Sequence, residues 1–134
     1  MKIRTIIPSL IILLILASLA GAEVVFNTFQ VEANGARAEI TWSTSDESDI
    51  TSFIIERSTD GIEFIEIATF TPQGVYQEYR YIDIDLFKDS IKTFHYRIKA
   101  VDRENQPHYS VVRTIQVSLS GIQQTWGSLK AMFR

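Results

Sequence analysis

Between Val24 and Leu119, short runs of β-branched and aromatic residues alternate with polar and turn-forming clusters. The runs have the period of two that places successive side chains on opposite faces of a strand, and helical periodicity is missing. We therefore expect about seven strands, at spacings typical of an all-β sandwich. These are Val24–Val31, Arg37–Ser43, Ser52–Ser58, Glu63–Thr71, Tyr79–Asp83, Thr93–Asp102 and Tyr109–Leu119.

Two of these segments show most clearly which face is buried. In the second segment, one face carries Ala38, Ile40 and Trp42, and the other carries Arg37, Glu39 and Thr41. In the sixth, Tyr96, Ile98 and Ala100 alternate with a largely cationic face. Both patterns predict half-buried strands.

Turn-forming residues divide the segments. Asn34-Gly35 and Asp60-Gly61 are pairs that tight hairpins favour, because both tolerate positive φ angles. Pro72-Gln73-Gly74 and Asn105-Gln106-Pro107 end further strands, since proline cannot donate to a ladder.

Residues 1–22 have the three-part form of a secretory signal. Lys2 and Arg4 precede an apolar run, Leu10–Leu16, and the segment ends in the small residues Ala20-Gly21-Ala22. We expect cleavage after Ala22 and a protein that is secreted or held in the cell envelope. No cysteine follows the apolar run, so lipid attachment there is excluded.

Retention of this segment as a single membrane anchor is the alternative. The nearly uncharged stretch Ile6–Ala22 is shorter than the roughly 20 residues that cross a bilayer. Pro8 also interrupts it, which favours the signal.

Without the signal, 112 of the 134 residues remain, which suits one domain with one core. Removing Lys2 and Arg4 leaves 11 basic against 16 acidic residues, a net charge of −5, which argues against nucleic acid as a partner. The chain has no cysteine, so stability must come from packing, and thiolate zinc sites are excluded. We expect the domain at residues 23–120 and a tail at residues 121–134.

The pattern resembles a fibronectin type III module, an immunoglobulin-like sandwich held by packing without disulfides. Trp42 is similar to the tryptophan on the family's second strand, and Tyr96 in Tyr-Arg-Ile-Lys-Ala-Val-Asp is similar to the tyrosine on its sixth. Segments such as Ile55–Gly61 resemble variants in bacterial secreted and surface proteins. The resemblance spans roughly Val24 to Leu119 and implies a fold but no reaction.

The chain departs from the family pattern at two points. The family commonly has Leu-x-Pro before its tyrosine, whereas Leu86 is followed by no proline. The Arg-Gly-Asp tripeptide of some integrin-binding members is absent.

Catalytic and metal-binding signals are weak. His95 and His108 have no metal-type spacing, and we expect both at the surface or its rim. No Gly-x-Ser-x-Gly occurs, so a hydrolase triad is unsupported and we expect no enzyme and no cofactor. Asp83, Asp85 and Asp89 could offer oxygens to calcium, but three acids fall short of the six to eight oxygens that it takes, which favours a solvated loop.

Aromatic residues gather between Tyr76 and Phe87, where exposed rings could stack on sugars. Core packing competes with this reading. Tyr79 and Tyr81 lie on the same side of one strand, so at least one should face inward, whereas Tyr76 follows a turn and could be free.

The tail has an apolar pattern that a dispensable tail rarely has. Its large apolar residues fall on one face of a helix and cations lie near its end. Gly127 and the short length make such a helix marginal without a surface to pack on. The apolar residues are Ile122, Trp126, Leu129 and Phe133, and the cations are Lys130 and Arg134.

Two functions follow from these patterns. The first is an exported, non-enzymatic binding or structural module at the cell surface, in adhesion or assembly. In it the tail, through Trp126, Leu129, Lys130 and Phe133, docks on a protein partner, another copy or a membrane surface. The alternative is a soluble glycan- or peptide-binding protein that uses Tyr76 and Phe87. For the tail, folding back on its own sandwich is the competing reading.

Overall fold

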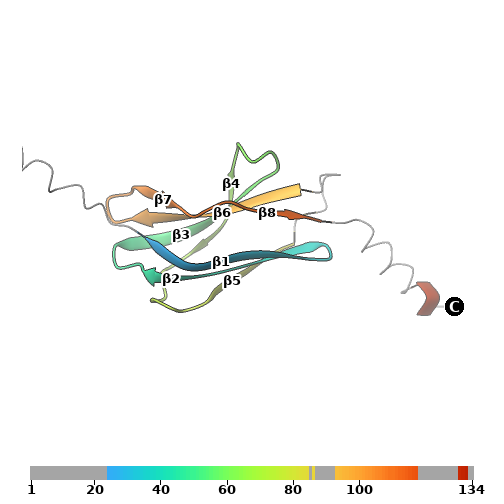
Figure 1. Cartoon of the computed structure of the whole chain (residues 1–134), viewed down its shortest axis with the longest axis horizontal. Helices are drawn as coiled ribbons and strands as arrows, with labels where there is room; N and C mark the ends of the chain where they lie inside the picture. Colours follow the sequence, from blue (N-terminus) through green and yellow to red (C-terminus); the bar gives the residue numbers. More distant parts are fainter. Residues whose placement is uncertain (1–23, 85, 87–92, 118–129, 133–134) are drawn as a thin grey trace, which may run out of the picture.

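The computed structural model describes residues 24–84, 86, 93–117 and 130–132, and within them the chain forms two antiparallel sheets. The sheets lie one above the other as a β-sandwich (Figure 1). The strands are β1 (Val25–Asn34), β2 (Arg37–Asp46), β3 (Ile50–Ser58), β4 (Ile65–Phe70), β5 (Tyr79–Asp83), β6 (Thr93–Asp102), β7 (Pro107–Tyr109) and β8 (Arg113–Gln116).

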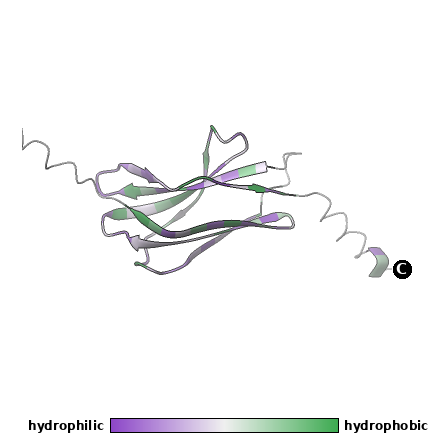
Figure 2. Cartoon of the chain, viewed as in Figure 1, coloured by the Kyte–Doolittle hydropathy of each residue, from purple (hydrophilic) through white to green (hydrophobic). Residues whose placement is uncertain are grey.

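The smaller sheet has the order β1-β2-β5, and the larger has the order β4-β3-β6-β7, with β8 also paired to β6. Apolar and polar positions alternate along most of these strands, as the hydropathy colouring shows (Figure 2). Within the described residues, no helix is long and apolar enough to cross a membrane. The predicted signal at residues 1–22 lies outside the described residues.

Trp42 is the centre of the core. Its ring stacks on Tyr79 of the neighbouring strand, with centroids 4.9 Å apart and planes at 6°. From the opposite sheet, Phe70 and Phe53 meet the indole edge to face at 5.1 and 6.3 Å. Such aromatic pairs add to the energy of apolar burial, so Trp42 joins the two sheets.

The burial predicted from alternation is confirmed for β2 and β6. Ile40 and Trp42 in β2 and Tyr96, Ile98 and Ala100 in β6 are all 0% exposed.

The first turn lies one residue later than predicted. Asn34 pairs with Arg37, so Gly35 and Ala36 form the turn, and Gly35 has a φ of +59°. Glycine suits this left-handed conformation because it has no Cβ to clash.

The single last strand predicted at Tyr109–Leu119 is instead divided into β7 and β8. Lys99 of β6 pairs with Tyr109, whereas Tyr96 pairs with Arg113. Between these two pairs, the three residues 110–112 therefore face the two residues 97–98 of β6. An extra residue on one strand is the arrangement of a β-bulge.

Ser110 maintains the pairing with β6 within this bulge. Its N–H donates to the Ile98 carbonyl at 2.9 Å, and its Oγ accepts the Ile98 N–H at 2.8 Å. Val111 and Val112, which follow it, are 62% and 46% exposed. The bulge thus turns two valines outward that the sequence pattern placed within a continuous strand.

Asp83 does not lie in a solvated loop, contrary to the reading that the sequence favoured. Its carboxylate is buried, pairs with the Arg57 guanidinium at 2.7 Å and accepts the Tyr96 hydroxyl at 2.9 Å. Burial and the adjacent carboxylate raise the pKa of Tyr96 far above its usual range, so the phenol remains a donor. This contact links β6 to the end of β5, whereas the tyrosine corner of sandwich domains uses backbone.

Replacing Tyr96 with Phe should lower the free energy of unfolding by about 1.5–3 kcal/mol, because a buried carboxylate loses a donor. Chemical denaturation would measure the change, and a double-mutant cycle with Asp83→Asn should show coupling between the two sites. Tyr76→Phe, at an exposed position, is the control and should change stability by no more than about 0.5 kcal/mol. Equal effects of Tyr96→Phe and Tyr76→Phe would contradict the role of this contact.

Candidate functional site

The outer face of the larger sheet carries a stack of three side chains from different segments. The Arg97 guanidinium lies 4.0 Å from the centroid of the Phe64 ring and 4.1 Å from that of Tyr109. Its Nε donates to the Glu56 carboxylate at 2.5 Å. Cation–π contacts and an ion pair together fix the guanidinium, and we call Phe64, Arg97 and Tyr109 the Arg97 stack.

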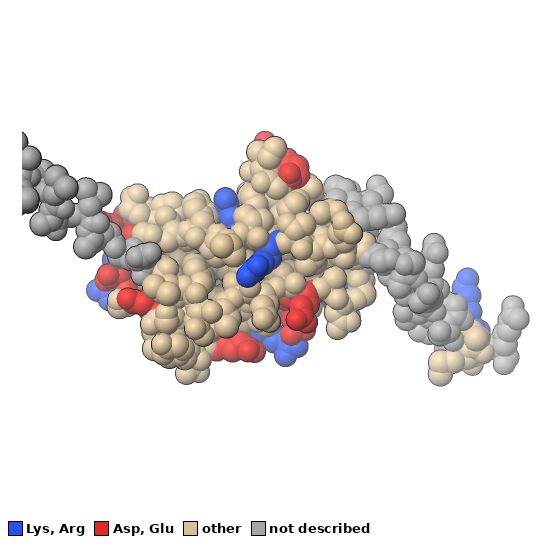
Figure 3. All heavy atoms as spheres, in the orientation of Figure 1, with Lys and Arg blue, Asp and Glu red and all other residues tan. Residues whose placement is uncertain are grey.

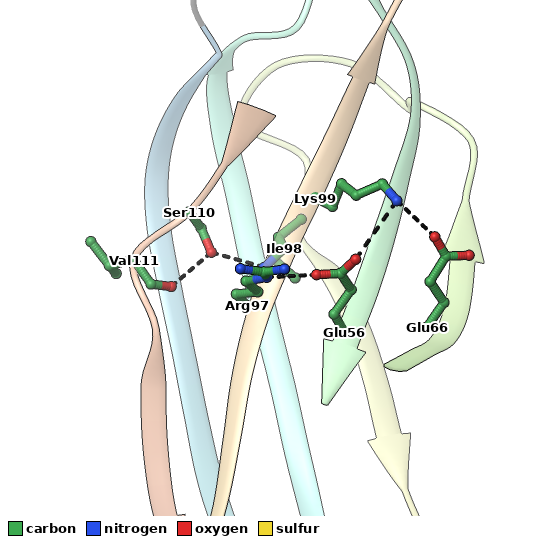
Figure 4. A network of polar contacts seen from close by, with 7 residues as sticks. All are labelled: Glu56, Glu66, Arg97, Ile98, Lys99, Ser110 and Val111. Carbon is green, nitrogen blue, oxygen red and sulfur yellow. Dashed lines mark hydrogen bonds and ion pairs between the residues drawn. The ribbon is translucent and has the colours of Figure 1, made fainter. Parts of the chain in front are cut away.

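A second cation lies beside the Arg97 stack. Lys99 Nζ is 2.7 Å from a Glu66 carboxylate oxygen and 3.7 Å from one of Glu56 (Figure 4). The Glu66 hydrogen bond raises the pKa of Lys99. The charges of the cations Arg97 and Lys99 are therefore balanced by those of the carboxylates Glu56 and Glu66.

A groove of about 330 Å³ lies on the same face. Apolar Ile54, Val101 and Pro107 line it together with Lys99 and two uncharged polar residues, Ser52 and Asn105. Tyr109 does not line the groove itself but lies next to two of its lining residues, because it pairs with Lys99 and is two residues from Pro107 on β7.

Asp102 organises the β6–β7 turn at one end of the groove. Its carboxylate accepts the N–H groups of Glu104 and Gln106 at 2.9 and 2.8 Å and lies 2.8 Å from His108 Nε2. The His108 hydrogen bond and these backbone donors lower the pKa of Asp102 below its ordinary value. The turn holds Asn105 at a φ of 63°.

A further hollow, of about 230 Å³, lies near Arg57, Asp60 and Leu86. Two of the charged groups that line it, those of Arg57 and Asp60, already have partners. Arg57 pairs with Asp83, and the Asp60 carboxylate accepts two backbone N–H groups, which lower its pKa.

Of the described aromatic residues in the predicted cluster between Tyr76 and Phe87, only Tyr76 is largely exposed. Tyr76 is 67% exposed, whereas Tyr79 is 2% exposed, as expected for one of the strand tyrosines. Tyr81 is partly buried against the core, and Phe87 lies outside the described residues.

Buried Glu47 holds the loop that carries Tyr76. Its carboxylate accepts the Thr44 hydroxyl at 2.6 Å, the Tyr79 hydroxyl at 3.1 Å and the Gly74 N–H. The Tyr76 N–H donates to the Thr44 carbonyl at 2.8 Å. Burial raises the pKa of Tyr79, so its hydroxyl stays protonated as a donor to the Glu47 carboxylate.

The remaining predicted residues are separated or lie outside the described part of the chain. His95 and His108 are partly exposed, as expected, and bond to Thr114 and Asp102. Asp85 and Asp89 of the calcium hypothesis are outside the described residues, and among those described no three acidic or histidine side chains gather as metal ligands.

Of the tail, Lys130, Ala131 and Met132 are described. They are helical and exposed, with Met132 83% exposed. Trp126, Leu129 and Phe133 lie outside the described residues, so the amphipathic helix stays a prediction.

Charges on the visible face of the molecule are mixed. Acidic and basic side chains adjoin one another along the lower edge, and basic side chains also lie within the broad uncharged area at the centre (Figure 3).

No protein-family model and no curated protein sequence matches the chain. Among solved structures, it is similar to a beta-1,2-glucanase from Parabacteroides distasonis, with 23% identity and a TM-score of 0.53 over 72% of this chain and 13% of that chain. It is also similar to the pectate lyase PelI from Erwinia chrysanthemi, with 19% identity and a TM-score of 0.51 over 69% of this chain and 28% of that one.

These two likenesses show the fold alone. The chain is a β-sandwich domain. It spans 13% of the glucanase and 28% of the pectate lyase. The activities of those two enzymes therefore do not carry over to this chain. A Fn3-like protein from Clostridium thermocellum is also similar, with 20% identity and a TM-score of 0.48 over 68% of this chain and 88% of that chain.

The Arg97 stack of the sandwich domain was missed by sequence reasoning. Alternation placed Arg97 and Lys99 on the outer face, and that is confirmed. Nothing in the sequence pattern joins them to Phe64 and Tyr109, because these residues come from separate segments that meet only when the sheet forms.

The turn at Asp102 should make stability depend on pH. Its folded-state pKa lies below the ordinary 3.8, so the carboxylate stabilises the fold fully above pH 3.8 and loses this effect as the pH falls through the folded-state value. In thermal unfolding between pH 7 and 2, the gap between wild type and Asp102→Asn should therefore narrow in acid. Asp49→Asn, which removes a nearby carboxylate, is the matched control, and its stability difference from wild type should not narrow in acid in the same way. A gap that stays constant down to pH 2 would refute the prediction.

Proposed function

We propose that this chain is an exported, non-enzymatic binding or structural module of the fibronectin type III kind, and that residues 121–134 attach it to a partner at the cell surface. Fully buried Trp42 on β2 and Tyr96 on β6 support the family resemblance. The tail contributes the attachment, by docking its apolar face on a protein, another copy of the chain or an anionic membrane surface.

One observation carries this proposal. The described sandwich forms a continuous core whose buried members run from Phe29 to Val117, before the tail begins. The apolar face predicted for residues 122–133 is therefore additional to a core that is already extensive. A short amphipathic helix needs a surface to pack on, and in this proposal a partner supplies that surface.

Deletion of residues 121–134 should shift the protein from an assembled or envelope-bound form to a free monomer, as measured by light scattering and cell fractionation. Trp126→Ala with Phe133→Ala should have the same effect, because it removes the predicted apolar face. Gln123→Ala with Gln124→Ala, off that face, is the matched control and should behave as wild type. Unchanged native mass and unchanged location after the deletion would make the tail part of the fold instead.

Export is tested separately by protease digestion of intact cells. The proposed location requires that the protein be degraded while a cytoplasmic marker survives. A protected, cytoplasmic protein would overturn it.

Binding of a glycan or peptide by the loop aromatics is the second candidate function. The exposure of Tyr76, on a loop held by Glu47 and Thr44, favours it. This function requires that Tyr76→Ala abolish binding while tail deletion leaves binding intact.

A further inference from the structure

We propose that the groove beside Tyr109 on the outer face of the larger sheet binds a neutral oligosaccharide. The residues that line the groove belong neither to the tail sequence nor to the Tyr76 loop. This binding goes beyond the attachment role, because it would supply the module with a ligand of its own.

The first support is the placement of the Tyr109 ring. The Arg97 guanidinium lies 4.1 Å from its centroid, and Arg97 is itself held by Glu56 and Phe64. Tyr109 nevertheless remains 49% exposed. A ring that is fixed on one face and open elsewhere is preorganised for stacking, which reduces the entropy lost on binding.

The second support is the charge balance. Arg97 and Lys99 are paired with Glu56 and Glu66, so the face carries no excess of either sign. A charged ligand would have to compete with these ion pairs and lose its own hydration, with no surplus charge to compensate. An uncharged ligand meets no such cost.

The third support is the pair of polar side chains at the groove, Ser52 and Asn105. Within the described residues, neither makes a side-chain hydrogen bond, although both line the groove. A hydroxyl and a carboxamide can each donate and accept, as sugar hydroxyls do. A wholly apolar ligand would leave both unpaired.

Together these features define the ligand class. The apolar floor of Ile54, Val101 and Pro107 and the Tyr109 ring suit the C–H faces of sugar rings, and the polar groups suit their hydroxyls. The volume of about 330 Å³ falls at the lower end of the range for small-ligand sites, which fits one short stretch of an oligosaccharide.

Affinity electrophoresis of the full-length exported chain tests this assignment, in gels that contain hydroxyethyl cellulose, mixed-linkage β-glucan, galactomannan or xylan. Polygalacturonate provides the anionic comparison, and a broad glycan array extends the set. We expect retardation by at least one neutral polysaccharide and none by polygalacturonate. No binding to any neutral glycan in either assay, or binding to polygalacturonate alone, would overturn the proposal.

Variants locate the site. Tyr109→Ala should weaken binding roughly tenfold, whereas Tyr109→Phe should retain it, because stacking needs the ring and not the hydroxyl. Asn105→Gly removes the carboxamide, and glycine tolerates the positive φ at this position. This variant should also weaken binding, and it tests the groove even if Tyr109→Ala fails to fold. Tyr76→Ala and deletion of residues 121–134 are the controls and should bind as wild type.

The site fails if Asn105→Gly and Tyr109→Ala, both folded by thermal unfolding, bind as wild type, or if Tyr76→Ala alone abolishes binding. Failure of the attachment role is a separate outcome. It would appear as an unchanged native mass after deletion of residues 121–134, which affinity electrophoresis does not measure.

Discussion

The packing of Trp42 between the two sheets is the interaction on which this molecule depends. The chain has no cysteine, so no disulfide can join the sheets. They are joined by apolar packing and by the polar contacts of Asp83 on β5 with Arg57 on β3 and Tyr96 on β6. Trp42 stacks on Tyr79 within its own sheet and meets Phe53 and Phe70 of the other. Its indole N–H is the one buried side-chain polar atom without a partner among the described residues, so packing outweighs the cost of an unmade hydrogen bond there.

Polar groups at the two ends of this core are buried only where they are paired. Asp83 is held by Arg57 and Tyr96. Glu47 accepts hydroxyl groups of β2 and β5 and the backbone N–H of Gly74, which lies in the loop between β4 and β5. Because both carboxylates are satisfied internally, they fix geometry and are not available as reactive groups. The unpaired polar side chains of the groove lie instead on the outer face of the larger sheet, which is why binding is assigned to that face and not to the interior.

The sequence predicts the parts of this fold that a local period determines. Alternation identified the buried faces of β2 and β6, and a tyrosine of β5 was expected inside. The split of the last strand was not predicted, because Val111 and Val112 have high strand propensity and a bulge is defined only by its partner strand. The Arg97–Glu56 contact joins residues 41 positions apart, and no local pattern contains such information. Asp83 was misread for the same reason, since its partners come from other strands.

Mapping the ligand contact residue by residue tests the central claim most directly. The amide chemical shifts of the isotope-labelled protein would be followed by NMR during titration with an oligosaccharide. This oligosaccharide would be a fragment of whichever polysaccharide slows the protein in affinity electrophoresis. The account predicts changes confined to Ser52, Ile54, Lys99, Val101, Asn105 and Tyr109 and their neighbours on the outer face. Changes centred on the Tyr76 loop, or no change with any neutral oligosaccharide, would contradict it.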